Sequence, residues 1–343
     1  MAALALANLH GRVFGHPQGP AVCSTRVQNK YRGHPSISSP NEFTLMPPIR
    51  RRLPGTPNPM HRVTLPSGLE IAADSFGPES GRPVLLLHGG GQTRHAWRSA
   101  GERLGEVGYH AIAVDLRGHG DSTWDEFGDY GYDAMAQDLV AFVDQRDLRR
   151  PVLVGASLGG AVSLIAVGEG LVDASALVVV DTAPRLEPGG VQNLRRFMTG
   201  RPEGFASLED VADAIAEYNP RRKRSKTLVG LAKNIRLDDA GRYHWHWDPR
   251  FMSHDRQPGD SEKREARMEA SVRSLMLPTL LVRGGLSDLL SEEGAAGFLE
   301  QAPHSEYVNI TDASHMVAGD RNDLFGDATV EFLGRVAAPD ADL

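Results

Sequence analysis

Residues 152–162 read VLVGASLGGAV, an apolar run followed by small residues around one serine. Gly155, Ser157 and Gly159 stand in the order Gly-x-Ser-x-Gly, which is typical of a tight turn from a buried strand into a helix. Glycines suit such a turn because its backbone is strained and its segments approach closely. The stretch therefore predicts a strand, a turn that exposes the Ser157 hydroxyl, and a helix over 158–170.

The same alternation of strand and helix extends on both sides of this stretch. Apolar runs of strand character cover 62–65, 69–76, 83–89, 110–118, 151–157, 176–184, 278–285 and 305–315. Helical patterns cover 94–106, 132–145, 158–170, 292–301 and 322–337. The first two runs are separated by Pro-Ser-Gly and predict a hairpin. Strands that are apolar on both faces and separated by helices indicate a parallel sheet covered on both sides. We therefore predict an α/β fold with a mostly parallel, doubly wound sheet.

The alternation is interrupted after the sixth predicted strand. Residues 184–277 show no convincing strand but contain helical patterns over 190–199, 207–218, 222–235 and 261–275. We expect a mostly helical cap over 184–277, inserted between core segments 61–183 and 278–338. Residues 1–60 are rich in Pro, Gly, Ser and Arg without sustained periodicity, and we expect a disordered tail, or translation that starts at Met46 or Met60.

Composition limits the classes of function. The chain has 343 residues and a net charge of −7, although its first 45 residues carry four basic side chains against one acidic side chain. The acidic body argues against nucleic acid as a partner. No apolar run approaches the ~20 residues of a membrane span. Cys23 is the single cysteine, which rules out an internal disulfide and favours a reducing, cytoplasmic location.

Candidate catalytic residues follow the predicted strands. Ligands of doubly wound sheets bind beyond the carboxyl ends of the strands. Ser157, Asp288 and His315 each stand at or just after such an end, and so do His88 and the glycines at 89–91.

The order serine, aspartate, histidine is that of the α/β-hydrolases, and five segments resemble that family's landmarks in sequence. These are HGGGQTRHAW (88–97), DLRGHGDS (115–122), GASLGG (155–160), GGLSD (284–288) and ASHMV (313–317). The resemblance covers residues 62–337, except for the divergent cap. It implies an α/β-hydrolase fold and a serine nucleophile.

Each predicted role has a chemical reason. The Ser157 hydroxyl needs a base to take its proton, and His315 lies between the last strand and the final helix. Asp288 would fix the tautomer of His315. Asp181, which ends another strand, is the alternative acid, but the Gly284–Gly285 turn favours Asp288.

An oxyanion, the charged oxygen of the reacting carbonyl group, needs backbone N–H donors. Leu158, at the start of the helix, supplies one such N–H group. By resemblance Gly90, together with Gly91, would supply the other.

Other features are assigned structural roles. His88 is expected to shape the glycine loop and Asp115 to bind buried amides. His244, His246, Asp248, His254 and Asp255 are metal-ligand types, but their spacing matches no zinc signature, and we predict no metal. The basic run at 220–226 reads as a solvated surface.

We expect a serine hydrolase that cleaves an ester, or a related acid derivative, of a small to medium apolar substrate through an acyl-enzyme on Ser157. Hydrolysis of a carbon–carbon bond, a lactone or an amide would use the same triad. A ligand receptor with little turnover is a further alternative. Serine at the turn disfavours epoxide hydrolases and haloalkane dehalogenases, which by resemblance carry aspartate there. The chain has neither a dinucleotide fingerprint nor a phosphate loop, so no cofactor is expected.

Overall fold

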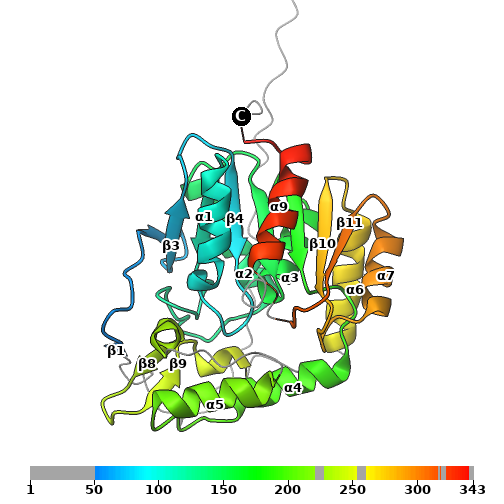
Figure 1. Ribbon diagram of the computed structural model, residues 1–343. Helices are drawn as coiled ribbons and strands as arrows, with labels where there is room; N and C mark the ends of the chain where they lie inside the picture. The colour runs from blue at the N-terminus through cyan, green and yellow to red at the C-terminus, as the bar shows by residue number, and fades with distance from the viewer. Residues whose placement is uncertain (1–50, 221–227, 253–259, 316, 318–321, 340–343) are drawn as a thin grey trace, which may run out of the picture. The chain divides into compact units, whose positions relative to one another are not determined.

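The structure is a computed structural model that describes residues 51–220, 228–252, 260–315, 317 and 322–339. One eight-stranded sheet forms its centre (Figure 1). Its strands lie in the order β11-β10-β7-β6-β4-β5-β3-β2, and β3 alone runs opposite to the other seven. They are β2 (His61–Thr64), β3 (Glu70–Phe76), β4 (Pro83–Leu87), β5 (His110–Val114), β6 (Val152–Ala156), β7 (Ala176–Val180), β10 (Thr279–Gly284) and β11 (Glu306–Ile310). The predicted fold class is confirmed.

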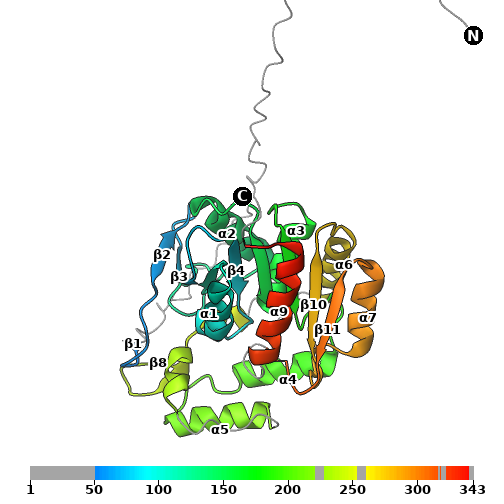
Figure 2. The ribbon, with the colours of Figure 1, turned by 45° about the horizontal axis from the view of Figure 1, so that its top comes forward.

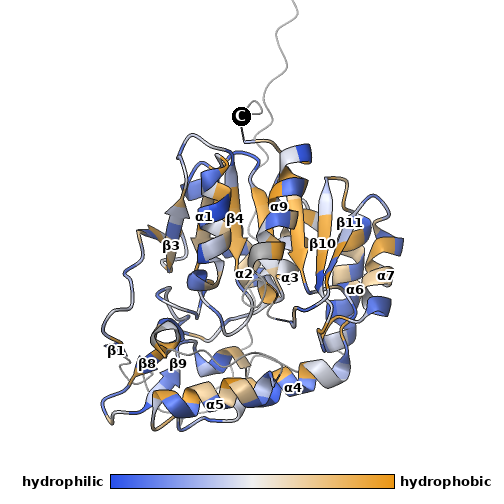
Figure 3. Ribbon diagram, in the orientation of Figure 1, coloured by the Kyte–Doolittle hydropathy of each residue, from blue (hydrophilic) through white to orange (hydrophobic). Residues whose placement is uncertain are grey.

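Helices cover both faces of the sheet because the central strands are apolar on both sides. One face carries α1 (Arg98–Glu106) and α9 (Asn322–Val336), which pack on one hydrophobic cluster. The other carries α2 (Tyr132–Gln145), α3 (Leu158–Gly168), α6 (Asp260–Arg273) and α7 (Glu292–Gln301), which pack on a second cluster. Colouring by hydropathy shows apolar strands between helices with polar outer faces (Figure 3).

An insertion between β7 and β10 forms the cap. It contains α4 (Pro188–Thr199), α5 (Leu208–Tyr218), β8 (Ile235–Leu237), β9 (Tyr243–Trp245) and the short 3-10 helices Val229–Asn234 and Pro249–Met252. A further 3-10 helix, Arg94–Trp97, precedes α1 in the core. Both ribbon views place α4 and α5 across one end of the sheet (Figures 1 and 2). The insertion therefore follows the sixth strand of the sheet, as predicted.

The predicted cap differs from the structure in four respects. It is not purely helical, because β8 and β9 pair antiparallel and β8 also pairs with β1 (Arg51–Arg52). Residues 51–52, assigned to the tail, thus belong to the sheet of the cap. The pattern over 222–235 ends in a 3-10 helix and β8 rather than in a continuous α-helix, and residues 221–227 lie outside the described part.

The fourth difference concerns α6, which the sequence places in the cap. Its Met268 and Val272 belong to the core cluster beside α3. Gly168 makes this close packing possible, because a Cβ there would lie 2.5 Å from Cα of Ser271. The core therefore resumes at α6, before residue 277.

Candidate active site

Ser157 occupies the turn between β6 and α3 with φ 48° and ψ −109°. A positive φ at a residue other than glycine costs about 1–3 kcal/mol and is concentrated at functional sites. Tight contacts impose this turn: a Cβ on Gly155 would lie 2.3 Å from Gly159 O, and one on Gly159 would lie 2.3 Å from Leu87 O. The two glycines of the motif are therefore required by packing.

The strand beside β6 presents a second strained residue at the same edge. Asp181 directly follows β7, has φ 50°, and is 1% exposed. The backbone N–H of Ser157 donates to the carbonyl of Val180 over 2.9 Å, which ties the serine turn to the residue before Asp181.

Asp181 is the acid that contacts His315. Its Oδ2 lies 2.7 Å from His315 Nδ1, and the histidine side chain is 8% exposed. Since an ionised carboxylate only accepts hydrogen bonds, Nδ1 carries the proton and Nε2 of a neutral ring is left as the basic nitrogen. The pair thus fixes the tautomer that a general base requires.

The predicted role of Asp288 is wrong in this structure. Its side chain is exposed, and its Oδ2 accepts from Nδ2 of Asn193 on α4 at 3.2 Å. The turn after β10 explains the difference, because Ser287 Oγ accepts from the N–H groups of Leu289 and Leu290. Ser287 is thereby directed toward Asp181, with its Oγ 2.5 Å from Oδ2 of the carboxylate.

The sequence offers Asp181 only as the alternative acid. The available signal was its position at the end of the run VVVD, directly after the strand that adjoins the strand of Ser157.

The glycine loop after β4 lies against the serine turn. A Cβ on Gly89 would lie 3.4 Å from Ser157 Cβ, and one on Gly90 would lie 4.0 Å from Leu158 Cβ. No acceptor for the N–H groups of Gly90 and Leu158 is found in the described part of the chain. Both amides are therefore available as oxyanion donors.

Gly91 does not fit its predicted role as a donor. Its N–H donates to Nε2 of His119 at 3.1 Å, so this amide is already used within the protein. His119 is held in turn through Nδ1, 3.0 Å from the carbonyl of Arg117. Gly91 thus anchors the loop rather than facing the reacting centre.

Buried histidines support the loop. Burial lowers the pKa of His88 to about 4 and that of His119 to about 3, so both rings are neutral. His88 Nδ1 donates to the carbonyl of Gly89, and Nε2 accepts from the N–H of Leu116. The expected structural role of His88 is confirmed by these contacts. The same holds for Asp115, which accepts from the N–H groups of Arg94 and Asp121.

Apolar side chains of the cap lie over the glycine loop. A Cβ on Gly91 would lie 3.0 Å from Met198 Cε and 3.2 Å from Trp247 Cζ3, and one on Gly90 would lie 3.4 Å from Phe251. Trp247 stacks on Trp245 with ring centroids 5.2 Å apart. The surroundings of the candidate oxyanion site are thus aromatic and apolar.

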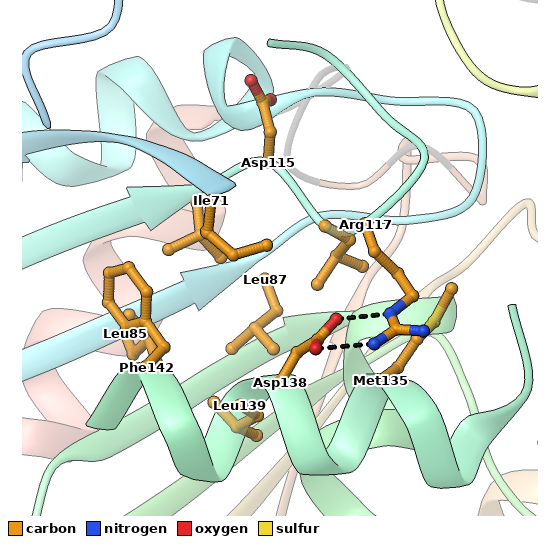
Figure 4. Close-up of a pocket in the computed structure, with 11 residues that line it drawn as sticks. Ile71, Leu85, Leu87, Asp115, Arg117, Met135, Asp138, Leu139 and Phe142 are labelled. Carbon is orange, nitrogen blue, oxygen red and sulfur yellow. Dashed lines mark hydrogen bonds and ion pairs between the residues drawn. The ribbon is translucent and has the colours of Figure 1, made fainter. Parts of the chain in front are cut away.

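A small pocket lies away from these residues. It has a volume of about 20 Å³, room for about one water molecule, and lies between the sheet and α2 (Figure 4). Arg117 and Asp138 form a buried ion pair at its wall, with Arg117 Nη2 2.7 Å from Asp138 Oδ1. It contains none of the candidate catalytic residues and is too small for a substrate.

The described residues bring no three His, Cys, Asp or Glu side chains together in an arrangement that could hold a metal ion. His254, Asp255 and residues 221–226 of the basic run lie outside the described part. Within residues 51–220, 228–252, 260–315, 317 and 322–339, no helix combines the length and apolar character needed to cross a membrane.

Comparison with known proteins decides the family. A model of the alpha/beta hydrolase family matches residues 84–328. The chain belongs to the alpha/beta hydrolase family. Both its sequence and its fold are those of an enzyme of this family.

Among its relatives, this hydrolase is 32% identical to the esterase Rv0045c of Mycobacterium tuberculosis, over 78% of this chain and 87% of that protein. It is 25% identical to the 3-hydroxybutyrate-oligomer hydrolase of Cupriavidus necator, over 73% of this chain and 88% of that protein. The solved structure of E-2-(acetamidomethylene)succinate hydrolase superposes with a TM-score of 0.70 at 22% identity, covering 80% of this chain and 98% of that one. At 22% identity, the similarity to this solved structure concerns the fold alone.

Proposed function

We propose that this enzyme hydrolyses carboxylic esters through an acyl-enzyme on Ser157, with His315 as the base and Asp181 as the acid that orients it. The observation that carries the proposal is the 2.7 Å contact between His315 Nδ1 and Asp181 Oδ2, beside the strand that ends at Ser157. The similarity to an esterase over 78% of the chain supports the same reaction.

The proposed reaction has two halves. Ser157 Oγ attacks the acyl carbon while its proton passes to Nε2 of His315, and Asp181 stabilises the imidazolium. The N–H groups of Gly90 and Leu158 bind the oxyanion. Collapse of this intermediate releases the alcohol, which takes its proton from His315. Water, activated by the same histidine, then frees the acid and restores the Ser157 hydroxyl.

The cap suggests the class of substrate. Met198, Trp247 and Phe251 border the glycine loop, and these side chains favour apolar groups next to the reacting carbonyl. We propose esters of small to medium size with an apolar acyl or alcohol portion. A charged group beside the carbonyl would lose hydration without gaining an ionic partner from these three residues.

The test is hydrolysis of p-nitrophenyl esters of increasing acyl length, with an aromatic ester and a lactone measured in parallel. Wild-type turnover of the apolar esters is expected, with kcat reduced by about four to six orders of magnitude in Ser157→Ala. Undiminished ester hydrolysis by folded Ser157→Ala would exclude the mechanism. Lactone turnover without ester turnover would redirect the proposal to a cyclic substrate.

A further inference from the structure

The hydroxyl of Ser287 touches the same carboxylate oxygen as His315. Oδ2 of Asp181 lies 2.5 Å from Ser287 Oγ and 2.7 Å from His315 Nδ1. The other oxygen, Oδ1, accepts from the N–H of Gly284 at 2.8 Å. Ser287 and His315 therefore bind Oδ2 of Asp181 together.

The direction of the Ser287 hydrogen bond follows from its other contacts. Ser287 Oγ accepts from the N–H groups of Leu289 at 3.1 Å and Leu290 at 3.2 Å. A hydroxyl offers one proton and two lone pairs, so these amides use its accepting capacity. The proton is left for Asp181, whose ionised carboxylate can only accept. The turn 287–290 thus holds Ser287 in place independently of the aspartate.

We propose that Ser287 is a positioning residue of the triad, a fixed donor that locks the plane of the Asp181 carboxylate toward His315. This inference rests on the proposed function in one respect, namely that His315 serves Ser157 as a base. Without the Ser287 hydroxyl, Oδ2 would be held by the histidine alone. Gly284 would still hold Oδ1, but the carboxylate would keep only two of its three hydrogen bonds, and the imidazole would lose part of its fixed orientation.

No charge near the pair changes when Ser287 is replaced. Asp288, its neighbour in the chain, is bound to Asn193 on α4. Arg283 on β10 donates to the carbonyl of Leu290 and to Glu292. An effect of Ser287→Ala on catalysis would therefore arise from the lost hydrogen bond rather than from altered electrostatics of an ion pair.

The kinetic test compares Ser287→Ala with Ser287→Thr and Ser291→Ala on a p-nitrophenyl ester. Ser287→Ala is expected to lower kcat about ten- to a hundredfold, the effect of losing one hydrogen bond to a charged group, while KM stays within about twofold. Ser287→Thr keeps a hydroxyl and should recover most of kcat. Ser291 is a matched control because its Oγ accepts from the N–H of Gly294 at the start of α7 and has no contact with Asp181. Ser291→Ala should lower the melting temperature but leave kcat unchanged.

A spectroscopic readout separates this inference from the proposed function. The Nδ1 proton of His315 should give a downfield proton resonance that is absent in His315→Ala. The resonance should move in Ser287→Ala and stay in place in Ser291→Ala, whether or not the enzyme hydrolyses the chosen ester. An unmoved resonance, or an unchanged kcat in folded Ser287→Ala while Ser157→Ala is inactive, would overturn the role of Ser287 and leave the proposed function standing. Absence of ester turnover in the wild type would reject the proposed function, and the resonance would still decide the role of Ser287.

Discussion

A carboxylate with 1% exposure must have partners on both oxygens, because an unsatisfied buried charge costs several kcal/mol. Asp181 meets this condition through Gly284, Ser287 and His315. In the proposed mechanism this carboxylate stabilises the imidazolium of His315. Asp288, which is exposed and bound to an amide of the cap, has no such arrangement.

The assignment of the acid predicts different outcomes for two matched substitutions. Asp181→Asn should lower kcat for ester hydrolysis by about 10⁴-fold, because an amide no longer enforces the productive tautomer of His315. Asp288→Asn should leave kcat within about twofold. Steady-state kinetics on one ester compares the variants. A severe loss in Asp288→Asn together with near-normal Asp181→Asn would restore Asp288 as the acid.

At the level of single residues, the sequence predicts where Ser157 and His315 stand but not which aspartate meets the histidine. Both aspartates follow buried strands, and their order in the chain fits the family equally well. The choice depends on which side chain of the turn after β10 points inward, and backbone hydrogen bonds to Ser287 settle that. The sequence likewise does not predict that the Gly91 N–H donates to His119, because this hydrogen bond joins segments that are distant in the chain.

The long elements were predictable because their hydrophobic patterns are strong. All eight strands of the central sheet lie at the predicted places. The five strands β4, β5, β6, β7 and β10 are buried on both faces, and such burial demands continuous apolar runs. The three-residue strands β8 and β9 carry no such pattern. The pattern over 261–275 predicts helix α6 but places it in the cap, because periodicity locates an apolar face and does not say which partner covers it.

Strand β8 joins the cap to the core through a buried ion pair. Arg236 Nη2 lies 2.8 Å from Asp121 Oδ1, and both side chains are about 5–6% exposed. Asp121 also pairs with Arg94, which contacts Asp74 and Asp115 as well. Burial lowers the pKa of Arg236 despite the attraction of Asp121. The contact links β8 of the cap to the core, although burial of the cation has a cost of its own.

Removal of this cation should destabilise the protein. Arg236→Met is expected to lower the free energy of unfolding by about 3 kcal/mol, the lower end of the range for breaking a buried pair, because Asp121 retains Arg94. The matched control is Arg51→Met, which removes an exposed pair with Asp239 and should cost less than about 1 kcal/mol. Urea unfolding of both variants measures the difference. Equal free energies of unfolding for Arg236→Met and Arg51→Met would contradict the structural role of the pair of Arg236 and Asp121.

At the scale of the whole described molecule, buried neutral histidines lie in both the cap and the core. His246 lies next to the cap residues Trp245 and Trp247, and its N–H and C=O groups bond to Asn234 and Gly120. Burial lowers the pKa of His246 well below its ordinary value of 6.5. His88 and His119 on the core side share this property, with pKa values of about 4 and about 3.

These histidines predict acid lability with a definite sign. Their pKa values are lower in the folded state than in the unfolded chain, so below pH 6.5 the unfolded chain binds protons that the folded protein excludes. Stability is unaffected by them above that pH and falls as the pH drops toward about 4. Each contributes a slope of about 1.4 kcal/mol per pH unit.

Urea unfolding at pH 7, 6 and 5 measures this slope. His246→Phe should reduce the slope of stability against pH by the contribution of one histidine, about 1.4 kcal/mol per pH unit. Equal stability of the wild type at pH 7 and pH 5 would contradict burial of the three rings in neutral form.

The most direct test of the central claim is covalent labelling by a fluorophosphonate, read by intact mass and peptide mapping. The reagent reacts with a serine only when a base activates it and donors bind the developing oxyanion. We predict one adduct per chain, located on Ser157, and no adduct on Ser157→Ala. Unlabelled wild-type protein that is correctly folded, or labelling that persists in Ser157→Ala, would contradict the account.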